Sequence, residues 1–228
     1  QSIDLQGAEL SLLAYPGNVI INPNGMRVSL EGSATTTSSD PCIREWDDGT
    51  FDAVVAESPD IGTPPSGFPE DFGGGILISD DFGHQALYAL WKSGLLCYVV
   101  DEDLGFPIDT SLLGLLAGDA FNQLFPESKP MVIVTRPKKP PTMNFTTDHD
   151  VGLKVDELGL DFMAELDHRL ARVLAIDLEV DAGVDINLDA ETGQMGVAID
   201  LGSDSITPTV SSNDFAPDSS ETIETSFA

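Results

Sequence analysis

Acidic side chains at alternate positions are the most suggestive chemical pattern in this 228-residue chain. In the run "DLEVDAGVDINLDAETG" carboxylates alternate with apolar residues, and the acidic positions are Asp177, Glu179, Asp181, Asp185, Asp189 and Glu191. Carboxylate oxygens suit Ca²⁺, but the D-x-[DN]-x-[DN]-G-x₅-E loop of an EF-hand does not occur. Residues two apart on a strand share one face, so these carboxylates would repel one another unless water or a cation screens them. A solvated acidic face is the favoured interpretation, and a calcium site is the alternative.

Groups that could perform catalysis follow no known motif. The three histidines, His84, His149 and His168, are scattered, and neither G-x-S-x-G nor a P-loop is present. Pairs of carboxylates are no evidence for an acid–base catalytic site here, because a chain with 39 Asp and Glu residues contains many such pairs in any case. The Cys and His spacing fits no zinc site. We therefore expect no enzymatic activity, no cofactor and no bound metal.

The charge balance restricts the partners of the protein. Ten Lys and Arg residues against 39 acidic ones give a formal net charge of −29, which repels phosphate backbones, so we expect no nucleic-acid partner. A solvated acidic surface is favoured, and dedicated cation binding is the alternative. Four of the ten basic residues gather near the proline turn "TRPKKPP", as a solvated loop or as a tip that contacts lipid headgroups: Lys129, Arg136, Lys138 and Lys139.

The stretch "SDDFGHQALYALWKSGLLCYVV", residues 79–100, predicts a helix followed by a buried strand. Ser79, Asp80 or Asp81 can cap the helix N-terminus, and the acidic pair suits the positive end of the helix dipole. A broad apolar stripe at four-residue spacing follows. Gly94 suits close packing or the end of the helix.

A second apolar helix is expected from about Asp109 to Phe125, capped by Asp109 or Thr110. Residues 1–35 alternate like strands, with a turn at "NPNG". From Met131 onward apolar and polar residues alternate with a period of two, which predicts strands, with a break between strands at "PKKPP" and a hairpin turn at "DAETG". The predicted fold class is α+β: a strongly curved antiparallel sheet rolled around one long apolar helix plus a shorter one.

The domain organisation follows from composition. We expect strands and then a Pro/Gly/Ser-rich linker in residues 1–70, the predicted helices and alternating strands in 71–207, and a polar, partly loose tail in 208–228. No apolar run reaches the roughly 18 residues that span a bilayer. Gln1 is not an initiator methionine, so we expect a removed leader or a longer parent protein. Cys42 and Cys97 can form one disulfide if the protein is exported; the alternative is two free thiols.

The order of these segments resembles a known family. The pair Ser79-Asp80 before a helix with Tyr88 and a following "GLL", the Leu-rich "SLLGLLAGDAFNQLFP", the strand ending in "PP", and the alternating strands resemble the C-terminal barrel of bactericidal/permeability-increasing protein and its lipopolysaccharide-binding and lipid-transfer relatives. The resemblance covers roughly residues 74–206 and implies a barrel in which a curved sheet surrounds a long helix (a TULIP-like barrel). It further implies that residues 71–207 form this lipid-binding barrel and that the strands within 1–70 belong to a preceding barrel or central sheet.

This resemblance implies a non-enzymatic protein, secreted or at the cell surface or periplasmic, that binds or transfers a lipid or other apolar ligand in a groove between helix and sheet. Transient membrane contact is a further expectation. The groove would be lined by Phe82, Leu87, Leu90, Trp91, Leu95, Leu112, Leu116 and Phe121. The alternative for each of these residues is an ordinary core position. The alternative for the protein is an acidic structural or interaction module with the same fold and a filled core.

Overall fold

The computed structural model describes residues 2–5, 8–22, 25–49, 79–101, 108–188 and 195–227. Several predicted features lie outside these ranges: the domain boundary near residue 70, the middle of the "NPNG" turn, and the hairpin turn at "DAETG" with the acidic positions Asp189 and Glu191. None of the helices in the described ranges has the length and apolar character needed to cross a membrane.

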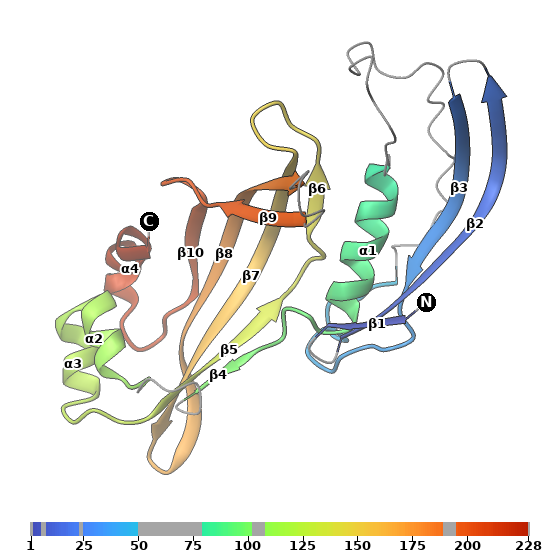
Figure 1. Ribbon diagram of the computed structural model, residues 1–228. Helices are drawn as coiled ribbons and strands as arrows, with labels where there is room; N and C mark the ends of the chain where they lie inside the picture. The colour runs from blue at the N-terminus through green and yellow to red at the C-terminus, as the bar shows by residue number, and fades with distance from the viewer. Residues whose placement is uncertain are drawn as a thin grey trace.

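The described strands form two antiparallel sheets (Figure 1). A three-stranded sheet contains β1 (Ser2–Leu5), β2 (Ala8–Asn22) and β3 (Gly25–Thr35). The seven-stranded sheet has the order β10-β8-β7-β5-β4, with β6 paired to β7 and β9 paired to β8. Its strands are β4 (Val99–Val100), β5 (Met131–Pro137), β6 (Thr142–Asn144), β7 (Val151–Leu166), β8 (Arg169–Leu188), β9 (Met195–Asp200) and β10 (Ile206–Ser212).

The larger sheet curls strongly into a half-barrel, as Figure 1 shows, and this confirms the predicted α+β class and the curved antiparallel sheet. The strand predicted to break at "PKKPP" does so, because Pro137 ends β5 and β6 begins at Thr142. The buried strand predicted at "LLCYVV" is reduced to β4, and Val99 is 59% exposed.

Helix α1 (Asp80–Lys92) begins as predicted, since the Ser79 side chain accepts a hydrogen bond from the Phe82 backbone N–H at 3.2 Å. Its C-terminal end is closed by Gly94, whose φ of +92° allows the Leu95 N–H to bond the Leu90 carbonyl. A side chain at Gly94 would also collide with Asp40.

The position of α1 differs from the prediction of a sheet rolled around one long helix. α1 packs against β2, β3 and β6, and it lies between the hairpin and the half-barrel (Figure 1). The reason is that its apolar residues occupy two sides: Phe82 packs toward the hairpin, whereas Gly83 meets Met143 of β6. A helix covered on two sides joins two sheets instead of filling one.

The second predicted helix is divided in two. α2 (Ser111–Ala117) and α3 (Asp119–Leu124) are separated by Gly118, which has a φ of +69°. The chain after residue 207, predicted as a loose polar tail, instead continues β10, a 3₁₀ turn (η2, Pro217–Ser219) and α4 (Ser220–Phe227). Ile223 of α4 is fully buried, which ties this segment to the core.

Two bulges keep the aliphatic side chains of β7 and β8 on one face of the sheet. The pairing shifts between Val155 and Leu158, opposite Val180 and Leu178, so both partners of each pair stay on the same side. A second shift, after Phe162, has the same effect. The bulge residue Glu157 has a φ of +53°.

Helices α2, α3 and α4 cover one end of this apolar face and form the main core with it. The buried members of the core include Leu113, Phe121, Phe125, Phe162, Leu174, Ile176 and Ile223. Cys42 and Cys97 form a disulfide, so the bridge that the sequence left open is present in the structure.

Replacing Phe121 by alanine tests this core. Phe121 is fully buried, and a Phe→Ala change in a packed core costs about 3–5 kcal/mol of unfolding free energy. Leu115 on α2 is 81% exposed, so Leu115→Ala should cost no more than about 0.5 kcal/mol. Chemical denaturation of both variants measures the difference, and similar losses for the two would contradict the assigned packing.

Candidate functional site: the open end of the half-barrel

The eight residues predicted to line a groove do not share one surface. Phe82 and Leu90 pack on the hairpin in a cluster with Leu10, Ala34 and Ala89. Leu112 and Phe121 belong to the main core at the helical end of the half-barrel. Leu87, Leu95 and Leu116 are each half-buried. Four of the eight residues are therefore divided between two separate clusters and the other four belong to neither, and the ligand-binding role of the set stays a prediction.

Trp91 connects α1 to the half-barrel. Its side chain is buried, at 2% exposure, and its indole N–H donates to the Pro137 carbonyl at 2.8 Å. Pro137 ends β5 of the half-barrel, whereas the neighbouring residues Ala89 and Leu90 of α1 pack on the hairpin. Trp91 thus has a satisfied structural position rather than a free ring edge.

An aliphatic surface that the sequence analysis did not single out lies at the other end of β8. The side chains at the even-numbered positions of β8 from 174 to 186 are all apolar and share one face. Leu174 and Ile176 are fully buried under the helices. The even-numbered positions from 178 to 184 are half-buried, and Ile186 is 48% exposed. The face therefore changes gradually from closed core to open surface.

Two edge strands extend this surface sideways. β9 and β10 follow one another along the same edge of β8, and each places aliphatic residues directly opposite those of β8. Val197 faces Ile186, Ile199 faces Val184 and Ile206 faces Val180. Val197 and Ile199 are 63% and 68% exposed. We call the exposed group of Ile186, Val197, Ile199 and Ile206 the open-end surface.

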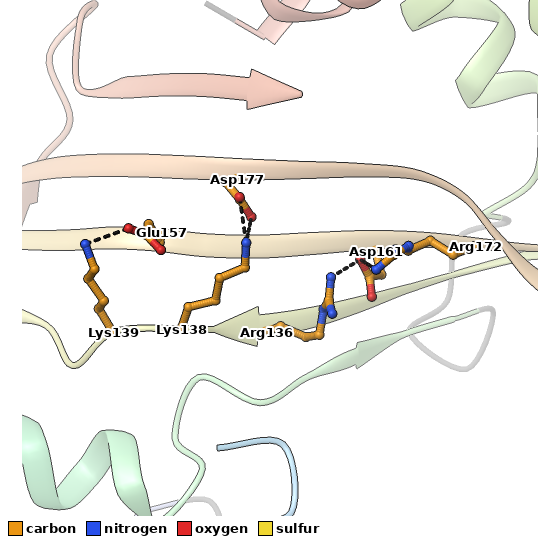
Figure 2. A network of polar contacts seen from close by, with 7 residues as sticks. All are labelled: Arg136, Lys138, Lys139, Glu157, Asp161, Arg172 and Asp177. Atoms are coloured by element: carbon orange, nitrogen blue, oxygen red, sulfur yellow. Dashed lines mark hydrogen bonds and ion pairs between the residues drawn. The ribbon is translucent and has the colours of Figure 1, made fainter. Parts of the chain in front are cut away.

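The opposite face of the same strands is charged. Figure 2 shows three basic side chains from the end of β5 and the turn after it reaching carboxylates on β7 and β8. Arg136 pairs with Asp161 at 2.5 Å, and Lys138 reaches both carboxylate oxygens of Asp177 at 2.6 Å. Acidic residues of the alternating pattern thus serve as partners for the few cations.

These ion pairs weaken the expectation that the basic residues near "TRPKKPP" form a tip that contacts lipid headgroups. Lys139 pairs with Glu157 at 2.6 Å, so three of the four basic residues gathered in the sequence have an acidic partner. Lys138 also lies 5.7 Å from the centre of the Trp46 ring. Cations neutralised in this way attract an anionic surface only weakly.

A pocket with both polar and apolar walls lies near the open end, beside the charged face. Its volume is about 490 Å³, and its walls come from β6, β7, β8 and the loop before β7. His149 from that loop lies over Gly183, and its pKa is raised, mainly by its contact with Asp185. No sequence pattern indicated this contact, because the two residues are 36 positions apart and belong to different elements.

The chain matches no family model and no curated protein in comparisons with known sequences. Assignment of a site therefore rests on the geometry described above.

Among the carboxylates of the charged face, that of Asp161 should contribute most to the stability of the fold. Asp161 is buried, at 7% exposure, and it lies between Arg136 and Arg172. Asp161→Asn leaves Arg136 without its ionic partner and should lower the free energy of unfolding by about 1.5–3 kcal/mol, the value of hydrogen bonds to charged groups.

Glu157→Gln is the matched control, because the Lys139–Glu157 pair is about half exposed on both sides. This change should cost no more than about 1 kcal/mol, and less in high salt. Urea denaturation of both variants makes the comparison. A larger loss from Glu157→Gln than from Asp161→Asn would contradict this ranking.

Proposed function

We propose that the protein binds an apolar ligand, such as the acyl chain of a lipid, at the open-end surface, without catalysing a reaction. The observation that carries the proposal is the gradient along β8, from fully buried Leu174 and Ile176 to half-exposed Ile186 on one continuous aliphatic face. A ligand placed on this face would extend the core that α2, α3 and α4 cover at the other end.

The energetics favour a chain of modest length. Each buried methylene contributes roughly 0.8 kcal/mol, so about ten of them supply on the order of 8 kcal/mol before ordering costs. The surface offers aliphatic side chains from three adjacent strands, which matches an extended hydrocarbon better than a compact polar molecule. No catalytic group is required for such binding.

We also propose a relationship to the lipid-binding barrel of the bactericidal/permeability-increasing family. Support comes from the order of elements: a helix capped at Ser79, a short strand, a Leu-rich helical segment, a strand that ends at a proline, and two long strands. The site differs from the family expectation, since α1 packs on the hairpin. A ligand would therefore lie at the open end instead of along α1.

The location of the protein is proposed on the same basis. The Cys42–Cys97 disulfide favours an oxidising compartment, which is compatible with a secreted, cell-surface or periplasmic protein. Transient contact with a membrane would accompany lipid exchange.

The alternative function is an acidic interaction module with a filled core. One observation favours it: the helical end of the half-barrel is closed, with Leu113, Phe121 and Phe162 each no more than 1% exposed. In that case the exposed aliphatic residues of β9 would contact another protein.

Two substitutions separate these functions. Ile199→Asp places a carboxylate in the middle of the open-end surface, whereas Ile21→Asp changes an equally exposed aliphatic residue on the β2–β3 hairpin. Uptake of pyrene-labelled phosphatidylcholine from vesicles should be weakened at least about tenfold by Ile199→Asp, equivalent to roughly 1.4 kcal/mol, and be unchanged by Ile21→Asp.

Thermal unfolding of the variants checks that both are folded. Absence of uptake by the unaltered protein would contradict ligand binding and favour the interaction module. Equal loss in both variants would place the ligand elsewhere.

A further inference from the structure

His149 lies where three parts of the charged face meet. Its backbone N–H donates to the Thr146 hydroxyl at 3.0 Å, and that hydroxyl donates to the His149 carbonyl at 2.7 Å, which fixes the loop between β6 and β7. The ring lies over Gly183 of β8, where any side chain would collide with it. The same glycine pairs with Asp200 of β9.

Both ring nitrogens of His149 face carboxylates. Nδ1 lies 3.1 Å from Asp185 Oδ2 on β8, and Nε2 lies 3.8 Å from Asp200 Oδ2 on β9. A neutral imidazole has one N–H and one lone pair, so one of these contacts would set a lone pair against an anion. Only the imidazolium donates from both nitrogens.

Backbone contacts reinforce the same junction. The Asp150 N–H donates to Asp185 Oδ1 at 3.3 Å, and the Asp150 carboxylate accepts from the Ile186 N–H at 2.8 Å. Ile186 belongs to the open-end surface on the opposite face of the sheet. The histidine junction and the open-end surface are therefore two faces of the same segment of β8 and β9.

The charges around the ring are mostly negative. The loop contributes Asp148 and Asp150, β8 contributes Asp181 and Asp185, and β9 contributes Asp200. β7 contributes Lys154, which is paired with Asp156 at 2.9 Å, and β6, from Thr142 to Asn144, contributes no charge. The environment favours the imidazolium.

We propose that protonated His149 is a pH-sensitive latch that fastens β9 and the β6–β7 loop to β8. A consequence, which rests on the proposed function, is that apolar-ligand binding at the open-end surface responds to pH. When the proton leaves, Asp200 loses its cationic partner, and β9, an edge strand, keeps its backbone pairing with β8 and the aliphatic pairs Val197–Ile186 and Ile199–Val184 but loses this ionic contact.

The direction of the pH response follows from the raised pKa of His149, which its hydrogen bond with Asp185 causes first. The stabilisation by the latch is complete below the ordinary histidine pKa of 6.5 and is lost as the pH rises through the raised folded-state pKa. The pKa of Asp185 is lowered by the same contact, so its carboxylate remains charged throughout this window.

Hydrogen–deuterium exchange of the peptide that covers β9 tests the latch from pH 5.5 to 8.5. Protection factors, corrected for the intrinsic exchange rate, should fall about two- to fivefold with rising pH, the range that exposed ion pairs give. In His149→Gln protection should be low and independent of pH. His168→Gln, which changes a 94% exposed histidine in the β7–β8 turn, should behave like the unaltered protein.

Protection that is constant with pH in the unaltered protein, or that falls equally in His149→Gln, would overturn the latch. Uptake of pyrene-labelled phosphatidylcholine, whose headgroup does not titrate in this window, tests the consequence separately. Uptake that does not change while protection falls would overturn the link to the ligand surface. No uptake at any pH would overturn the proposed function, and hydrogen exchange alone would then decide whether the latch exists.

Discussion

The paired alternation of β7 and β8 is the constraint on which the rest of the structure depends. A strand places successive side chains on opposite faces, so a shift of one residue would exchange the aliphatic and acidic sets. The bulges beside Leu158 and Phe162 absorb the two places where the sequence loses its period. Without the bulge beside Leu158, Leu153 and Leu160 would lie on different faces, and the aliphatic face of β7 would be interrupted.

The same alternation organises the charge. Because acidic residues occupy the odd positions of β8, the charged face gathers Asp177, Asp181 and Asp185 in one row, where mutual repulsion would be costly without partners. Lys138 compensates one end of this row, and His149 compensates the other. A strongly acidic chain thus uses its few cations where strands bring carboxylates together, and this use competes with any role in attracting anionic lipids.

The sequence predicted what depends on local pattern. Period-two alternation predicted the curved antiparallel sheet, Ser79 predicted the start of α1, and the prolines predicted the end of β5. It could not predict which sheet α1 would contact. Phe82 packs on the hairpin and Trp91 bonds to the half-barrel, but an apolar residue in a helix pattern does not indicate which partner it will contact. Nor could it predict the contact of His149 with Asp185 and Asp200 or the open-end surface, since both depend on the pairing between β8 and β9. The folded tail was missed because Ile223 is one apolar residue in a polar run.

The proposed binding of an apolar ligand at the open end of the half-barrel can be examined on the protein as purified. Native mass spectrometry of the gently purified protein, with lipid analysis of an organic extract, tests it most directly. We expect a stoichiometric mass increment that corresponds to a lipid with an aliphatic chain. A bare protein mass, together with no lipid in the extract, would contradict the account and favour a protein that uses this surface to contact another macromolecule.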